Sequence, residues 1–175
     1  MIALFRTTMI YVEKTNPLNY TSNFAVVNKL FSSKLGMPAH DRILPDKVIH
    51  LAQTSTEIVY GVYHNQNLLA YVHLTKVLQD KWNVSSVMTE ESRVTQGIMT
   101  NLFQVVLRDL GHIISNKVQN IGTKSLYLRF VEKNPEYSLW SIDVNNGLEL
   151  PFDYDNQDQY WDGRENIRIM IKRNQ

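Results

Sequence analysis

A glycine at the expected start of a helix is the first feature of this sequence that could bind a ligand. Gly97 follows an apolar run and a polar loop, and it precedes a long stretch with helical spacing. Backbone N–H groups at the start of a helix point outward and carry the positive end of the helix dipole, which favours phosphate and other anions. The pattern predicts an anion site at Gly97; alternatively, Gly97 only opens a core helix after a loop.

Other candidate constellations are weaker. The five histidines show no metal-ligand spacing, and His64 and His73, which flank a predicted hairpin, are expected to lie on strand faces. The acidic series Asp153, Asp155 and Asp158 lacks the glycine and the final glutamate of a calcium loop. The absence of cysteine excludes disulfides, thiolate metal sites and cysteine nucleophiles. The sequence therefore predicts no metal site.

Composition limits the class of protein. The chain has 175 residues, 18 basic and 17 acidic side chains and a net charge of +1. This balance argues against a strongly electrostatic nucleic-acid binder. Hydrophobic residues make up 43% of the chain and no apolar run approaches the roughly 20 residues of a membrane helix. We expect a soluble cytoplasmic protein with one domain over 1–175 and a core at about 9–172.

The elements that must position these residues alternate along the chain. Strands are expected at 9–13, 57–64, 68–77, 83–88, 112–115, 137–142 and 166–172, and helices at 24–35, 98–110 and 123–132. A short helix with Val48, Ile49 and Ala52 is expected behind a capping Asp46. Residues 151–165 are acidic and aromatic and are expected to form a long loop. Its aromatic residues could close over a substrate, meet a partner, or pack the loop on itself.

This order resembles the GNAT fold, that of the Gcn5-related N-acetyltransferases, over about Met9 to Lys172. The hairpin at 58–74 resembles the second and third strands of the family, and 86–102 resembles its fourth strand, pyrophosphate loop and main helix. The segment 113–130 is similar to a pattern in GNAT-like proteins of bacteriophages and plasmids, with Ser115, Gln119, Gly122, Leu126 and Tyr127 at matching offsets. The resemblance implies an α/β (α+β) fold with a mixed, mostly antiparallel central sheet flanked by helices.

The pyrophosphate loop departs from the family pattern. With Gly97 as the first glycine, Val94 stands where the family has Gln or Arg, and Met99 stands at the second small position. Arg93 lies one residue early. A long side chain at Met99 crowds the approach of phosphates, whereas main-chain N–H groups bind them whatever the side chain. The resemblance thus implies acetyl-CoA binding at the main chain of Gln96, Gly97, Ile98 and Met99.

Acetyl transfer to an amine needs few side chains. In the family the thioester carbonyl is polarised by a backbone N–H of the fourth strand, here near Val87 or Met88. The resemblance also implies Tyr127 as proton donor to the leaving thiolate; alternatively, Tyr127 is a half-buried aromatic with its hydroxyl at the surface. Glu90 is a candidate base acting through water; alternatively, Glu90 and Glu91 form a capping or solvated pair.

Two functions from different classes follow. The first is a phage-encoded, acyl-CoA-dependent N-acetyltransferase whose acceptor is an amine of a protein or small molecule. The second is a non-catalytic GNAT-fold protein that serves as a virion component or host-interaction module. They differ in whether the fourth and fifth strands of the family fold part to admit the cofactor. A nucleic-acid partner would need a basic stripe, whereas the Lys and Arg residues are dispersed. The sequence leaves a homo-oligomer open.

Overall fold

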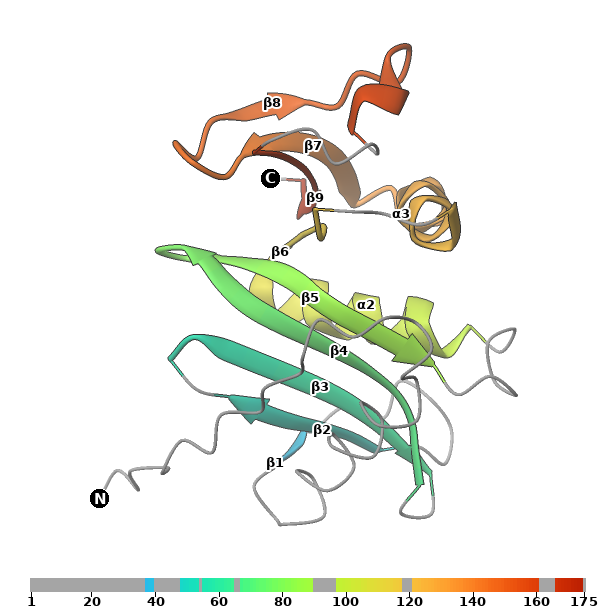
Figure 1. Cartoon of the computed structure of the whole chain (residues 1–175). Coiled ribbons are helices and arrows are strands. Elements are labelled where there is room, and N and C mark those ends of the chain that lie inside the picture. Colours follow the sequence, from blue (N-terminus) through green and yellow to red (C-terminus); the bar gives the residue numbers. More distant parts are fainter. Residues whose placement is uncertain are drawn as a thin grey trace. The chain divides into compact units, whose positions relative to one another are not determined.

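The computed structural model describes residues 37–39, 48–53, 55–64, 67–89, 97–117, 121–160 and 166–174 (Figure 1). The chain divides into two compact units. The first comprises Met1–His73 and Val87–Met99, and the second comprises Leu74–Ser86 and Thr100–Gln175. Strands β4 (Asn67–Leu78) and β5 (Lys81–Thr89) run through both units. The expected single domain over 1–175 stays a prediction.

The first unit is built from antiparallel strands. It holds β1 (Met37–Ala39), β2 (Val48–Gln53), β3 (Glu57–His64), the first part of β4 and the end of β5. In the register of β1 and β2, Met37 lies opposite Leu51, and in that of β2 and β3, Val48 lies opposite Tyr63. All six central residues of β3 are buried. The hairpin predicted at 57–64 and 68–77 is therefore confirmed.

The short helix predicted around Val48, Ile49 and Ala52 is wrong, because these residues belong to β2. β-branched residues at 48 and 49 fit a pleated surface better than a helix, and every residue of β2 finds a partner on β3. The sequence also gave no sign of β1. Pro38 lies inside it, which an outer strand tolerates because one side of that strand needs no ladder hydrogen bonds.

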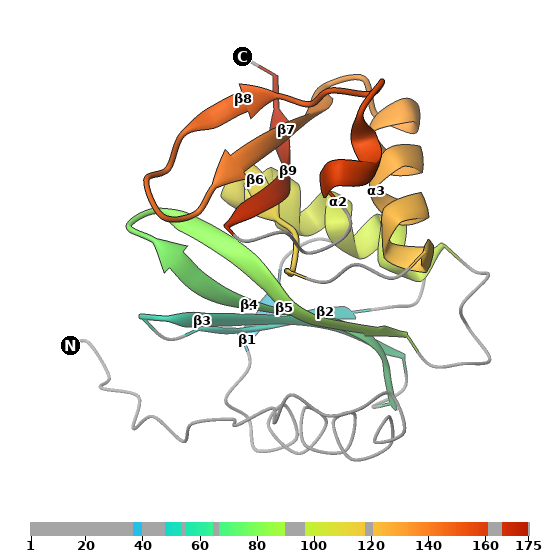
Figure 2. The same ribbon diagram turned by 45° about the horizontal axis from the view of Figure 1, so that its top comes forward.

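The second unit combines two helices with a mixed sheet. Its elements after β5 are α2 (Ile98–Leu110, its first two residues in the first unit), β6 (His112–Ile114), α3 (Ile121–Lys133), β7 (Tyr137–Asp143), β8 (Glu149–Pro151), the 3-10 helix η3 (Gln157–Tyr160) and β9 (Ile167–Arg173). The strand order is β5-β6-β9-β7-β8; β5 and β6 run parallel, whereas the pairs β6–β9, β9–β7 and β7–β8 are antiparallel. α3 packs beside β7, and η3 lies against β9 (Figure 2). A mixed, mostly antiparallel sheet flanked by helices is thus confirmed.

Buried side chains from both helices and from β4, β5, β6, β7 and β9 form the core of the second unit. α2 buries Leu102, Phe103 and the run Val105–Leu107, so its buried surface is wider than the single apolar stripe of the sequence. Asn134 ends α3 and joins the helices: its Nδ2 donates to the carbonyl of Phe130 at 2.6 Å, and its Oδ1 accepts from Gln104 Nε2 at 2.7 Å. Asn134 therefore satisfies the end of α3 and holds it to α2.

The region predicted as a loop at 151–165 holds regular structure at its beginning and in its middle. β8 includes Pro151, and η3 follows at 157–160. β8 is three residues long and is placed by pairing with β7, a long-range effect that local sequence does not reveal. The helices predicted at 98–110 and 123–132 and the strands predicted at 83–88, 112–115, 137–142 and 166–172 are confirmed. Those predicted at 9–13 and 24–35 lie outside the described residues. No helix in the described part of the chain is long and apolar enough to cross a membrane.

Candidate functional site

Gly97 stands directly before α2, is exposed, and has a φ of 68°. A residue with a side chain pays about 1–2 kcal/mol in this left-handed region. Among the described residues, no heavy atom lies within 4 Å of where a Cβ would be, and the first turn of α2 contains no acidic residue. The start of α2 thus combines the positive end of a helix dipole, an open glycine turn and a first helical turn without acidic residues, which suits an anion.

The two residues after Gly97 differ in their surroundings. The side chain of Ile98 is only 1% exposed and anchors the first turn of α2 in the core, whereas Met99 is half-buried. An anchored first turn holds its N–H groups in fixed directions, which is what a main-chain anion site needs.

The end of β5 is fixed by a cluster of apolar side chains. Met88 packs with Val59, Tyr63, Leu68 and Tyr71, and the Tyr71 hydroxyl donates to Met88 Sδ at 3.0 Å. Val87 is half-buried. Because the core uses the side chain of Met88, a ligand at Val87 and Met88 would meet the main chain, as the resemblance implies.

In the second unit, the ladder between β5 and β6 is short. The register pair that joins them is Asn83 with Ile114, and β6 ends at Ile114. The next residue, Ser115, bonds to β9: its N–H donates to the Ile169 carbonyl at 2.7 Å, and its Oγ accepts from the Ile169 N–H at 3.1 Å. Asn116 Nδ2 then reaches the Ser85 carbonyl at 3.4 Å. After β6, the chain is therefore bonded to β9 through Ser115. Its link to β5 is the side chain of Asn116 and not a backbone hydrogen bond of a ladder.

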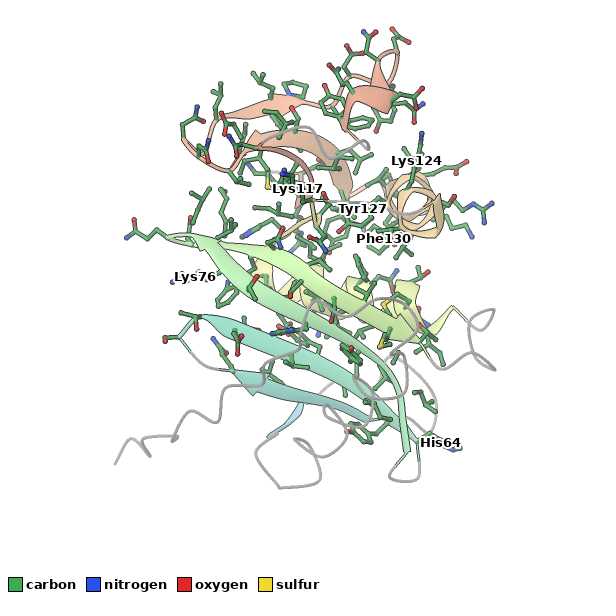
Figure 3. The ribbon with its side chains drawn as sticks, viewed as in Figure 1. His64, Lys76, Lys117, Lys124, Tyr127 and Phe130 are labelled. Atoms are coloured by element: carbon green, nitrogen blue, oxygen red, sulfur yellow. The ribbon has the colours of Figure 1, made fainter. Side chains whose placement is uncertain are left out.

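Tyr127 lies in α3, in the second unit, and its side chain is completely buried. Figure 3 shows Tyr127 and Phe130 on the side of α3 toward the strands, whereas Lys124 points away. The ring of Tyr127 packs edge-on against Phe103, with centroids 5.8 Å apart. Its hydroxyl has no hydrogen-bond partner among the residues described, and burial raises its pKa well above the usual value. The alternative that Tyr127 is half-buried with its hydroxyl at the surface is therefore wrong, because the whole side chain is buried.

The predicted site residues fall into three groups. Val87, Met88, Gly97, Ile98 and Met99 lie in the first unit, and Tyr127 lies in the second. Glu90, Glu91, Arg93, Val94 and Gln96 lie outside the described residues, as does Gln119. The roles assigned to all of these residues stay predictions.

In the acidic and aromatic segment after β8, the aromatic side chains pack against one another. Phe152 is buried and contacts Tyr154 and Tyr160, with ring centroids 4.9 and 4.8 Å away. Lys124 on α3 forms an ion pair of 3.1 Å with Asp158 on η3. These contacts favour the interpretation that the aromatic residues pack the segment against its own unit.

Sequence reasoning placed His73 on a strand face and did not predict that its side chain is buried. His73 on β4 is only 3% exposed, and Glu57 Oε1 on β3 lies 3.7 Å from its Nε2. A usable signal was the position of His73 within the apolar run from Leu68 to Leu74, which indicates a strand buried on both faces. Over the described ranges, no group of three or more His, Asp or Glu residues is placed to hold a metal ion.

No protein-family model matches the sequence, and no curated protein matches it. Among solved structures, the PaiA N-acetyltransferase from Thermoplasma acidophilum in complex with coenzyme A is 12% identical with a TM-score of 0.40, over 68% of this chain and 62% of that one. A GNAT-family acetyltransferase from Staphylococcus aureus is 13% identical with a TM-score of 0.40, over 68% and 69%. A Bacillus subtilis acetyltransferase in complex with CoA is 12% identical with a TM-score of 0.39, over 69% and 78%. This chain thus spans less than two thirds of the Thermoplasma protein.

Proposed function

We propose that this chain is an acyl-CoA-dependent N-acetyltransferase that transfers an acetyl group to an amine. The observation that carries the proposal is the turn at Gly97, which joins an exposed left-handed glycine to the start of a thirteen-residue helix. Main-chain N–H groups at such a turn favour phosphate groups, so they would hold the pyrophosphate of coenzyme A. The resemblance to GNAT acetyltransferases in segment 86–102 directs the choice of this ligand.

The reaction would use the main chain of this segment. The N–H groups of Gln96, Gly97, Ile98 and Met99 would hold the pyrophosphate, and a main-chain N–H at Val87 or Met88 would polarise the thioester carbonyl. We keep Glu90 as the candidate base acting through water and Tyr127 as the candidate proton donor.

The test is calorimetric titration of the full chain with acetyl-CoA, comparing Gly97→Asp with Gly97→Asn. The two variants have the same shape and share the cost of a left-handed φ, so they differ only in charge. We expect micromolar binding by the wild type, binding within a few-fold of that by Gly97→Asn, and at least tenfold weaker binding by Gly97→Asp, because its carboxylate repels the phosphates. Absence of wild-type binding up to millimolar acetyl-CoA would refute the proposal. So would equal binding by the two variants.

The second candidate is a non-catalytic protein with the same fold, and the burial of Tyr127 favours it. A hydroxyl enclosed among side chains reaches a thiolate only if the core opens. In this form the chain would be phage-encoded and act as a virion component or host-interaction module, with a protein partner in place of an acyl-CoA. The phage origin rests on the resemblance of segment 113–130, and a cytoplasmic location remains our expectation.

A further inference from the structure

A cavity of about 240 Å³ lies at the end of β9 in the second unit, and nothing in the proposed reaction uses it. It is lined by Trp140, Lys172, Arg173 and Asn174. Trp140 and Lys172 are half-buried, whereas Arg173 and Asn174 are exposed, so solvent reaches the cavity. Its volume is larger than that of a water molecule and smaller than that of a typical drug-sized site. A short molecule, or the end of a longer one, therefore fits it.

Two neighbouring strands place an aromatic ring and a cation together at this cavity. Lys172 on β9 lies opposite Ser138 on β7, and Trp140, two residues after Ser138, points to the same face of the sheet. Lys172 Nζ lies 5.2 Å from the centre of the Trp140 ring. The cavity thus offers an apolar surface beside a positive charge.

Hydrogen bonds hold the aromatic side of the cavity in place. Trp140 Nε1 donates to Ser138 Oγ at 2.9 Å, and Ser138 Oγ donates to Asn174 Oδ1 at 2.7 Å. Asn174 in turn donates from Nδ2 to the Pro135 carbonyl and from its main-chain N–H to the Glu136 carbonyl, both at 2.8 Å. A ring and a chain segment that are already ordered lose little conformational freedom when a ligand binds.

The cation at the cavity belongs to a cluster with excess positive charge. Glu149 Oε2 accepts from Lys172 Nζ at 2.6 Å, and Glu149 Oε1 pairs with Lys81 Nζ at 2.7 Å. Two ammonium groups thus share one carboxylate, and Arg173 adds a further positive charge at the exposed rim. An ammonium group carries three N–H donors, so Lys172 can donate to Glu149 and to a ligand at the same time. This balance of charge attracts an anion and repels a cation.

From this arrangement we infer that the cavity binds a carboxylate carried by a flat apolar group. Lys172 donates to the carboxylate, and Trp140 packs against the apolar group. The indole ring favours such an organic anion over inorganic phosphate, which has no apolar surface. The carboxylate belongs to a small aromatic acid or to the C-terminal residue of a peptide, and the test separates these two sources. The inference does not rest on the proposed function, because neither residue takes part in the proposed acetyl transfer.

The test titrates phenylacetate into the full chain and follows the indole N–H signal of Trp140 by ¹H–¹⁵N NMR, assigned with Trp140→Phe. We expect a saturable shift with a Kd of about 1 mM or lower. Lys172→Met should weaken binding at least tenfold, whereas Lys172→Arg should keep it within a few-fold because the charge remains. The neutral phenylacetamide should bind at least tenfold more weakly than phenylacetate, because it lacks the charge that Lys172 binds.

Lys76→Met is the matched control. Lys76 (Figure 3) also lies over a tryptophan ring, with its Nζ 5.8 Å from the centre of Trp82, but it does not line the cavity. The substitution removes the same charge from the chain as Lys172→Met does. Phenylacetate should therefore bind this variant as it binds the wild type, and the Trp82 signal should not move during the titration.

The absence of a saturable shift up to tens of millimolar phenylacetate would overturn the inference. So would equal binding of phenylacetamide, which would show that the charge has no role, or equal binding of inorganic phosphate, which would show that the ring has none. If Lys172→Met fails to fold, these comparisons in the wild type decide. An equal loss of binding in Lys76→Met and Lys172→Met would also overturn the site, because net charge alone would explain it.

The tripeptide Gly-Gly-Phe and its C-terminal amide identify the source of the carboxylate. Tighter binding of the free peptide than of phenylacetate, lost in the amide, would assign the cavity to the end of a peptide chain. Weaker binding of the free peptide than of phenylacetate would assign it to a small aromatic acid.

Discussion

The hydroxyl of Tyr127 is buried without a hydrogen-bond partner among the described residues. The variant Tyr127→Phe tests whether this hydroxyl contributes to stability or to catalysis. Removing the oxygen relieves an unpaired polar group and leaves the edge-on contact with Phe103 intact. We expect the free energy of unfolding to rise by about 1 kcal/mol in urea titrations. If Tyr127 donates a proton in catalysis, the same variant loses kcat while it gains stability. A variant less stable than the wild type would mean that the hydroxyl has a partner in solution.

His112 makes stability depend on pH. Its Nε2 accepts a hydrogen bond from the Trp82 N–H at 3.2 Å, which a protonated ring cannot do. Burial, followed by the positive charge of Lys81, lowers the pKa of His112. The unfolded chain, with a pKa near 6.5, therefore binds the proton first, and stability present above that value is lost as pH falls toward the folded pKa. Urea unfolding between pH 8 and 5 should show this loss, up to about 1.4 kcal/mol per pH unit. His112→Gln should show a shallower slope, and an equally steep slope would contradict the prediction.

At the scale of elements, Asn134 couples the ends of two helices. It caps α3 through the Phe130 carbonyl and accepts from Gln104 on α2. We expect Asn134→Ala to cost about 1–3 kcal/mol, because the buried Phe130 carbonyl loses its donor. A double-mutant cycle with Gln104→Ala should give a coupling of about 0.5–1.5 kcal/mol, measured by urea unfolding. Additive effects of the two substitutions would show that the hydrogen bond between the helices contributes nothing.

Sequence reasoning predicted those elements whose periodicity is strong over many residues. The spacing of apolar residues along 98–110 predicted α2 with the limits that the structure has, Ile98–Leu110. The strand at 48–53 was misread as a helix because its structure is set by pairing with β3, and β8 was missed because its structure is set by pairing with β7. For the candidate site, Gly97 was recognisable from its position before a helix, whereas the contact between His73 and Glu57 depends on the register of two strands. Burial of Tyr127 likewise depends on tertiary packing.

At the scale of the whole molecule, two units share two strands. β4 and β5 each contribute residues to both units, so neither unit keeps all its strands if the other unfolds. We therefore expect one cooperative transition, with calorimetric and van't Hoff enthalpies of unfolding that agree. This is the behaviour of the single domain predicted over 1–175. Two separate transitions by calorimetry would show instead that the chain holds two folding units.

The outer strand β8 affects the tendency of the protein to aggregate at high concentration. An outer strand offers unpaired backbone groups to other molecules, and Leu148 and Leu150, which are 56% and 54% exposed, add an apolar surface beside it. β8 is only three residues long and ends in Pro151, which has no N–H to donate. A strand of a second molecule that paired with β8 would form too few backbone hydrogen bonds for a stable association. The brevity of β8 and its terminal proline thus act against aggregation.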